Sequence, residues 1–129
     1  MNNVALVRTL MEAEDWQPLI DHLADDVVFN VTIPDGTPIS AEIRGKKGVV
    51  GHLRNLGEFL EFRQEQPPQF FGNGERVVVL GKESFEIKKT GATVTGSEYA
   101  TVVDLDDGVI TRFLVIQDMS GFVDAYRSD

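Results

Sequence analysis

Hydrophobic side chains recur every three or four residues in three parts of the chain, which is the spacing of a helix with one buried face. This pattern predicts helices over residues 3–13, 15–24 and about 46–62. Asp15 can cap the second helix, because Pro18 stands in the first turn that follows, where proline is tolerated. The helical elements are therefore expected in the first half of the chain.

Runs of β-branched and aromatic residues fill most of the remaining sequence and predict strands. The runs cover residues 27–33, 69–73, 76–88, 93–104 and 109–117, of which 69–73 is the weakest. Glycine, proline and aspartate stand between the runs, as expected for turns, and a short helix is expected after Ser120. The predicted order is helix, helix, strand, helix and then an antiparallel meander. This order indicates an α+β fold in one domain over residues 1–129.

Two of the predicted strands are apolar on both faces. Residues 77–80 read Val-Val-Val-Leu and residues 113–116 read Phe-Leu-Val-Ile, so neither run alternates as a half-exposed strand would. Three helices can cover one face of a curved sheet, but something else has to cover the other. A second copy of the chain is the simplest cover, and we expect a homodimer.

Composition narrows the possible functions. The chain has 129 residues, no cysteine and a net charge of −9. The lack of cysteine excludes disulfides, thiol catalysis and cysteine-ligated zinc, and it fits a reducing compartment, so we expect a cytoplasmic protein. The negative charge makes nucleic acid and anionic membranes poor partners. No segment approaches the roughly 18 apolar residues that are needed to cross a bilayer.

Several short motifs and one aspartate follow one another along nearly the whole chain. They are DW at 15–16, LADDVVF at 23–29, RGKKGV at 44–49, RVVVLG at 76–81, DGVITRF at 107–113 and Asp118. In this order and spacing they resemble the SnoaL-like branch of the nuclear transport factor 2-like superfamily. The resemblance implies a cone-shaped fold, in which a strongly curved, mostly antiparallel sheet wraps around helices and encloses one apolar pocket. The implied order of elements is ααβα and then ββββ.

The resemblance leaves the activity open. The superfamily includes polyketide cyclases, ketosteroid isomerases, dehydratases and limonene epoxide hydrolases, as well as members that only bind or assemble, and fold alone does not choose among them. We expect a small apolar or polycyclic ligand. If the protein is an enzyme, we expect cofactor-free proton transfer of the isomerase, cyclase or dehydratase type. The alternatives are a noncatalytic small-molecule binder and a dimerisation module of the same fold.

By this resemblance Asp118 is the expected acid or base. It follows a predicted strand on which Arg112, Leu114 and Ile116 share its side. A carboxyl at the mouth of an apolar cavity loses solvation, which raises its pKa and suits it to proton transfer. The alternative is that Asp118 caps the short helix expected after it.

Glu83 and Tyr99 are two further candidates for catalysis. Glu83 is the only charged residue among the alternate positions of the run 77–87, which favours a place in the pocket. Otherwise it is an exposed carboxylate near the rim. Tyr99 points to the opposite face of its strand from Glu98, and its hydroxyl can donate to a developing oxyanion. The alternative is that Tyr99 is a packing aromatic.

The pocket is expected to be lined by the inward side chain of each element. The expected lining consists of Trp16, Phe29, Phe59, Val79, Tyr99 and Ile116. Trp16 lies on the apolar stripe of its helix, which favours a role in the core over one as a ligand platform. His22 and His52 stand on separate predicted helices, without a second histidine at metal-ligand spacing, so we expect both at the surface or in an interface. No metal and no cofactor is expected.

Overall fold

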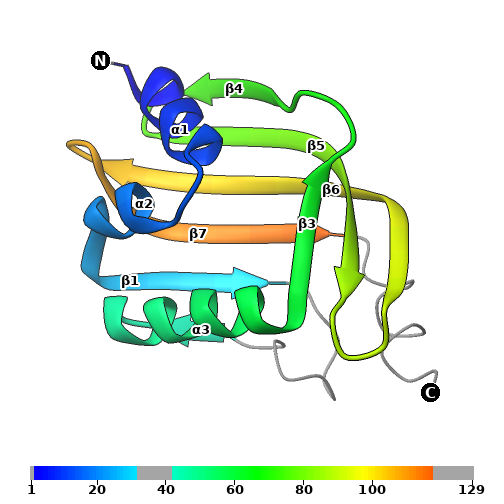
Figure 1. Cartoon of the computed structure of the whole chain (residues 1–129). Coiled ribbons are helices and arrows are strands. Elements are labelled where there is room, and N and C mark those ends of the chain that lie inside the picture. Colours follow the sequence, from blue (N-terminus) through cyan, green and yellow to red (C-terminus); the bar gives the residue numbers. More distant parts are fainter. Residues whose placement is uncertain (1, 32–41, 118–129) are drawn as a thin grey trace.

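The computed structural model describes residues 2–31 and 42–117, which form a curved sheet with helices packed against one side (Figure 1). The helices are α1 (Asn3–Glu12), α2 (Gln17–Asp21) and α3 (Lys46–Phe59). The strands are β1 (Leu23–Val31), β2 (Glu42–Arg44), β3 (Leu60–Gln64), β4 (Gln69–Asn73), β5 (Arg76–Ile87), β6 (Ala92–Asp106) and β7 (Val109–Gln117).

The seven strands of the described residues belong to one sheet with the order β2-β1-β7-β6-β5-β3, and β4 also pairs with β5. β1 and β7 are parallel, and the other neighbours are antiparallel. The long strand β5 carries two partners on the same edge, β4 along residues 76–80 and β3 along residues 83–87. Between these halves the pairing of β5 with β6 shifts register and β5 bends, so β3 crosses in front of the neighbouring strands (Figure 1).

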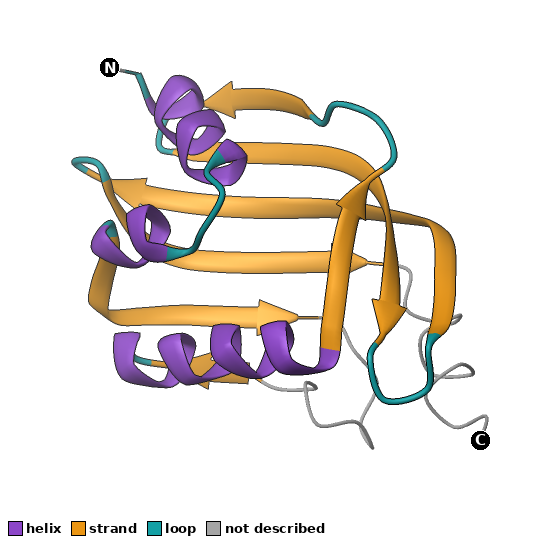
Figure 2. Ribbon diagram, viewed as in Figure 1, coloured by secondary structure: helices purple, strands orange, loops and turns teal. Residues whose placement is uncertain are grey.

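The helices cover the concave face of the bent sheet and close the core (Figure 2). The buried side chains of the core are apolar and come from every layer; they include Val7, Leu10, Leu19, Val27, Phe29, Val49, Leu53, Val77, Val79, Val103 and Phe113. The Asn2 side chain starts α1 by accepting a hydrogen bond from the backbone N–H of Ala5 at 2.7 Å. None of the helices in the described parts of the chain is long and apolar enough to span a membrane.

The outer face of the sheet carries an apolar row that no described element covers. Leu80, Ala100 and Ile116 lie side by side on β5, β6 and β7, and Val78, Val102 and Leu114 form the next row. Ile116 and Leu80 are 47% and 41% exposed. An uncovered apolar row is the feature that led us to expect a homodimer, and the dimer stays a prediction.

The α+β fold class with a curved sheet is confirmed, but several boundaries differ from the predicted ones. The third helix ends at Phe59 instead of residue 62, and the chain continues directly into β3. Leu60 and Phe62 pair there with Ile87 and Phe85, and this cross-strand packing outweighs the helical spacing. The short strand β2 was not predicted. The helix expected after Ser120 lies outside the described residues.

Candidate functional site

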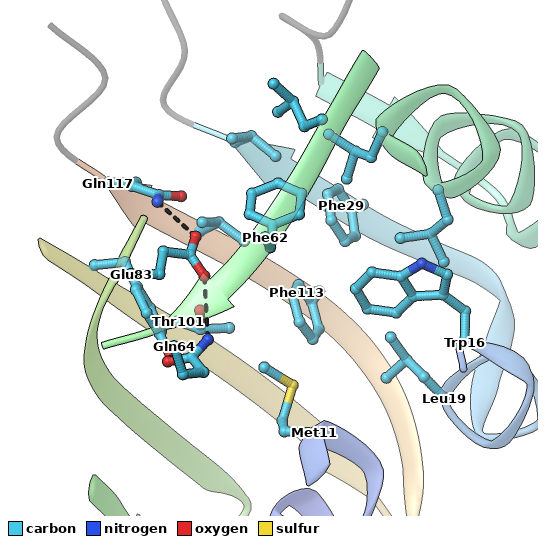
Figure 3. Close-up of a pocket in the computed structure, with 16 residues that line it drawn as sticks. Met11, Trp16, Leu19, Phe29, Phe62, Gln64, Glu83, Thr101, Phe113 and Gln117 are labelled. Carbon is cyan, nitrogen blue, oxygen red and sulfur yellow. Dashed lines mark hydrogen bonds between the residues drawn. The ribbon is translucent and has the colours of Figure 1, made fainter. Parts of the chain in front are cut away.

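A cavity of about 200 Å³ lies between the helices and the concave face of the sheet (Figure 3). Most of its wall is apolar; the aromatic and aliphatic lining residues are Met11, Trp16, Leu19, Phe29, Val31, Leu53, Leu56, Leu60, Phe62, Phe113 and Val115. Phe29 and Phe113 stack with their ring centroids 5.0 Å apart. Trp16 is 43% exposed, so it stands at the rim and not in the core. This wall suits a small, largely apolar ligand.

One end of the cavity is polar, where the bend in the sheet brings several strands together. Gln64 ends β3, Glu83 lies in the bend of β5, Tyr99 and Thr101 lie on β6, and Gln117 ends β7. The strand register brings these side chains together, because Gln64 is opposite Glu83 and Tyr99 is opposite Gln117. The polar residues therefore occupy adjacent rows of the same inner face.

A chain of hydrogen bonds links these side chains. The Gln117 amide donates to Oε1 of Glu83 at 2.7 Å and to the Ser97 hydroxyl at 3.2 Å. The Gln64 amide donates to the other carboxylate oxygen, Oε2, at 3.1 Å. The Tyr99 hydroxyl in turn donates to the carbonyl oxygen of Gln64 at 2.8 Å. Figure 3 shows the two amides on either side of the Glu83 carboxylate.

Gly81 makes room for this arrangement. It lies opposite Tyr99 in the β5–β6 pairing, and a Cβ atom at residue 81 would overlap the phenol ring and its hydroxyl. Only glycine lets the Tyr99 ring lie across the strand at this point. The position of the Tyr99 hydroxyl beside Gln64 therefore depends on a residue that itself has no side chain.

Burial determines the electrostatics of the polar end. Glu83 is 8% exposed, and this burial raises the pKa of its carboxyl, while the hydrogen bonds from Gln117 and Gln64 act to lower it. Burial, followed by the charge of Glu83, raises the pKa of Tyr99 to about 12, against the hydrogen bond to Gln64. Glu83 and Tyr99 are the titratable groups among the described residues that line the cavity, and no lysine or arginine stands among them.

Four of the candidate residues named from the sequence line this cavity: Trp16, Phe29, Glu83 and Tyr99. Their catalytic or binding roles stay predictions. The alternative that Glu83 is an exposed rim carboxylate is wrong, because the residue is buried. Asp118, the acid or base expected from the resemblance, lies outside the described residues.

The other three expected lining residues do not line the cavity. Ile116 is the clearest error, because it is 47% exposed on the outer face while Val115 and Gln117 face inward. Val79 shares the inner face but is fully buried in the core, and Phe59 is half-buried at the end of α3.

The sequence analysis missed Gln64, Thr101 and Gln117. Gln117 carries a usable signal, because it is the one polar residue on the alternate positions 113, 115 and 117 of a strand with an otherwise apolar face. Gln64 gave no such signal, since it lies outside the helices and strands that the sequence predicts. Thr101 looked like an ordinary strand residue.

The two histidines take no part in the polar end. The Nδ1 atom of His22 lies 2.8 Å from the Pro18 carbonyl oxygen. His52 is buried against Phe29, with ring centroids 5.1 Å apart, and not at the surface or in an interface as expected. Burial lowers the pKa of His52, which favours the neutral ring. The described residues contain no group of three or more histidine or acidic side chains that could hold a metal ion.

The sequence profile of the SnoaL-like domain matches residues 4–113, which is most of the chain. The chain belongs to the SnoaL-like domain family. The resemblance noted from the motifs is therefore confirmed. No curated protein matches this SnoaL-like chain.

Several solved structures have the same fold as this chain. An NTF2-like protein from Burkholderia xenovorans LB400 is 24% identical with a TM-score of 0.83, over 95% of this chain and 94% of that one. A proposed polyketide cyclase from Xanthomonas campestris pv. campestris is 18% identical with a TM-score of 0.75, over 94% and 91%. TerC, co-crystallized with polyporic acid, is 22% identical with a TM-score of 0.75, over 97% and 95%. At this identity the likeness shows that the SnoaL-like chain shares their fold.

Proposed function

We propose that this SnoaL-like protein binds a small, largely apolar molecule in the cavity and moves a proton on it without a cofactor. Isomerisation, cyclisation and dehydration of a carbonyl compound are reactions of this kind. The observation that carries the proposal is the Glu83 carboxyl, which is buried at the end of an apolar cavity with no cationic side chain among the described lining residues. A structural neighbour co-crystallized with a small molecule and a neighbouring proposed polyketide cyclase add support.

Glu83 is the acid or base in this proposal. A buried carboxyl with a raised pKa takes up a proton more readily than one in water, and it returns that proton within the same site. Tyr99 supplies a hydroxyl donor to the carbonyl oxygen, where negative charge develops as the proton leaves the neighbouring carbon. The apolar wall excludes water and strengthens both interactions.

Deuterium exchange tests this proposal before the natural substrate is known. The protein is incubated in D2O with enolisable aromatic ketones such as 1-indanone, and deuterium at the carbon next to the carbonyl is followed by NMR. We expect catalysed exchange that falls by about 100-fold or more in Glu83→Gln, because general-base catalysis contributes about 10²–10⁴. Equal exchange rates in the wild type and Glu83→Gln would refute the role of Glu83.

Asp118→Asn is the matched comparison, because Asp118 is the acid or base expected from the family resemblance. Loss of exchange in Asp118→Asn with full activity in Glu83→Gln would assign the proton transfer to Asp118. Loss in Glu83→Gln alone assigns it to Glu83.

A noncatalytic binder is the second candidate. Both carboxylate oxygens of Glu83 already accept a hydrogen bond from a glutamine, and such a fixed carboxylate also suits a recognition site. A protein that binds the ketones but exchanges no deuterium in any of them would support this alternative.

A further inference from the structure

The side-chain amide of Gln64 touches both titratable groups of the described cavity lining. Its NH2 donates to Oε2 of Glu83 and its carbonyl oxygen accepts from the Tyr99 hydroxyl. An ionised carboxylate can only accept hydrogen bonds, so this orientation of the amide belongs to the charged form of Glu83. In that state the hydroxyl hydrogen of Tyr99 is directed at Gln64 and away from a ligand.

Protonation of Glu83 at Oε2 reverses these requirements. The carboxyl then has an O–H to donate, and the amide has to turn its oxygen toward Glu83 to accept it. The same turn directs the NH2 of Gln64 at the Tyr99 oxygen, which becomes the acceptor. The hydroxyl hydrogen of Tyr99 is released and can point into the cavity. Gln64 is exposed at the rim, so its amide has room to turn.

We propose that Gln64 couples the two groups, so that the cavity offers the Tyr99 hydroxyl as a donor only while Glu83 carries a proton. The site would therefore take a ligand with a hydrogen-bond-accepting oxygen at one end, such as an aromatic ketone or its enolate. This inference rests on the proposed use of Glu83 in proton transfer. Gln64 is a positioning residue in it, since it acts through Tyr99.

The coupling has a consequence for catalysis. When Glu83 removes the proton next to a carbonyl, the C–H bond breaks, its electron pair forms the C=C bond, and the carbonyl π electrons move onto oxygen. Glu83 becomes protonated in the same step, and when this proton lies on Oε2 and faces Gln64, the amide turns and the Tyr99 donor is released to the enolate oxygen. An interaction that strengthens along the reaction lowers the barrier more than one that binds the substrate equally throughout.

Among the described lining residues, no other titratable side chain competes with this coupling. The inner face around Glu83 contains Gln64 on β3, Ser97 and Tyr99 on β6, and Gln117 on β7. The described helices contribute Met11, Trp16, Leu19, Leu53 and Leu56 to the lining, all of them uncharged. His52 lies outside the lining but is buried against Phe29 of the wall, so a pH-dependent change at the cavity is assigned to Glu83 only if Glu83→Gln removes it.

A pair of matched ligands tests the coupling. 1-Indanone and indane differ by one carbonyl oxygen, and their affinities can be measured against pH by ligand-observed NMR. For the wild type we expect 1-indanone to bind about fivefold more tightly below the titration of Glu83 than above it, the effect of one neutral hydrogen bond. Indane should bind equally at all pH values. If 1-indanone shows no advantage over indane at low pH, the proposal is overturned.

Four variants separate the coupling from direct contact between Glu83 and the ligand. Gln64→Leu and Tyr99→Phe should both lose the pH dependence, and Gln64→Asn, whose amide is too short to reach both groups, should repeat the result of Gln64→Leu. Gln117→Leu removes a donor to Glu83 but leaves the Gln64 bond to Tyr99 in place. It should keep the pH dependence, moved to higher pH. A pH dependence that survives in Gln64→Leu or Tyr99→Phe would overturn the coupling.

Glu83→Gln distinguishes this inference from the proposed function. The amide that this substitution introduces is permanently neutral and can donate to Gln64, so the variant should bind 1-indanone at every pH as the wild type does at low pH. It should also lose deuterium exchange. Full exchange with pH-independent binding refutes the proton-transfer role and leaves the coupling standing. Lost exchange with the weak, high-pH affinity refutes the coupling and leaves Glu83 as the acid or base.

Discussion

Replacement of Gly81 by alanine tests how the polar end of the cavity is built. The new methyl group would overlap the Tyr99 ring and hydroxyl, which cross β5 at this glycine. Tyr99 can respond in two ways. It can keep its place under steric strain, or it can swing away and lose its hydrogen bond to Gln64. Either response should destabilise the protein and disturb the cavity.

The expected magnitude follows from these contacts. Overpacking of this kind costs about 1–3 kcal/mol, and a lost hydrogen bond costs about 1 kcal/mol. Alanine also stabilises the folded state by about 0.5–1 kcal/mol relative to glycine, because a glycine in a strand loses more conformational entropy on folding. We therefore expect Gly81→Ala to lower the free energy of unfolding by about 1–2 kcal/mol.

Urea unfolding of four proteins measures the effect: the wild type, Gly81→Ala, Tyr99→Ala and the double variant. Because the clash requires the Tyr99 ring, Gly81→Ala should no longer destabilise in the Tyr99→Ala background and should stabilise by up to about 0.5–1 kcal/mol there. The coupling free energy should then be about 1 kcal/mol or more, as found for residues in contact. A neutral Gly81→Ala, or additive effects in the double variant, would refute this account of Gly81.

Three further predictions concern the carboxyl, a helix and the outer face. Glu83→Gln should be more stable than the wild type at high pH, because a raised pKa means stability present at low pH and lost as pH rises through the folded-state value. The gain should be about 1.4 kcal/mol per unit by which the pKa is raised, measured by urea unfolding against pH. Gly51→Ala should stabilise α3 by about 1 kcal/mol in thermal unfolding, because no neighbouring atom opposes the methyl group. Ile116→Lys on the exposed outer row should convert the expected dimer to a monomer in light scattering, while Thr93→Lys should not.

Each of these three has a result that contradicts it. The first is contradicted if the stability of the wild type, relative to Glu83→Gln, stays constant or increases as the pH rises through the acidic range. Burial would then not disfavour the charged form of Glu83. If Gly51→Ala is less stable than the wild type, α3 requires a residue without a side chain at position 51. A wild-type monomer at micromolar concentration would show that the apolar outer row has no second copy to cover it.

The strand pattern predicted which residues alternate, but it did not show which alternate set faces the cavity. For β5 the inner set was recognisable, because Glu83 alone interrupted an apolar face. For β7 the run 113–116 is apolar on both sides, the signal of Gln117 was not used, and the choice of Ile116 over Val115 and Gln117 was wrong. A run that is apolar on both sides does not indicate which side faces the cavity, because that depends on pairing with distant strands.

Long-range pairing also hid one of the central residues of the site. Gln64 was not recognised because the helical spacing before it continued to residue 62, whereas β3 exists only through its pairing with the second half of β5. Local sequence predicted the fold class, the helices and the candidates Glu83 and Tyr99. It could not predict the hydrogen bonds that join them, since the bonded residues are 19 to 35 positions apart.

The bend in β5 divides the sheet into two parts that differ in how many paired strands surround them. Residues 76–80 are paired on both sides, with β4 and with the part of β6 that also pairs with β7. Residues 83–87 belong to a three-stranded arm with β3 and residues 92–97, and no further described strand pairs with its far side. Local opening takes place where fewer contacts have to break. Backbone amides of the arm should therefore exchange with solvent by partial opening, while those at 77–79 should exchange only by global unfolding. A ligand that bridges Glu83 and the helices would reduce this difference.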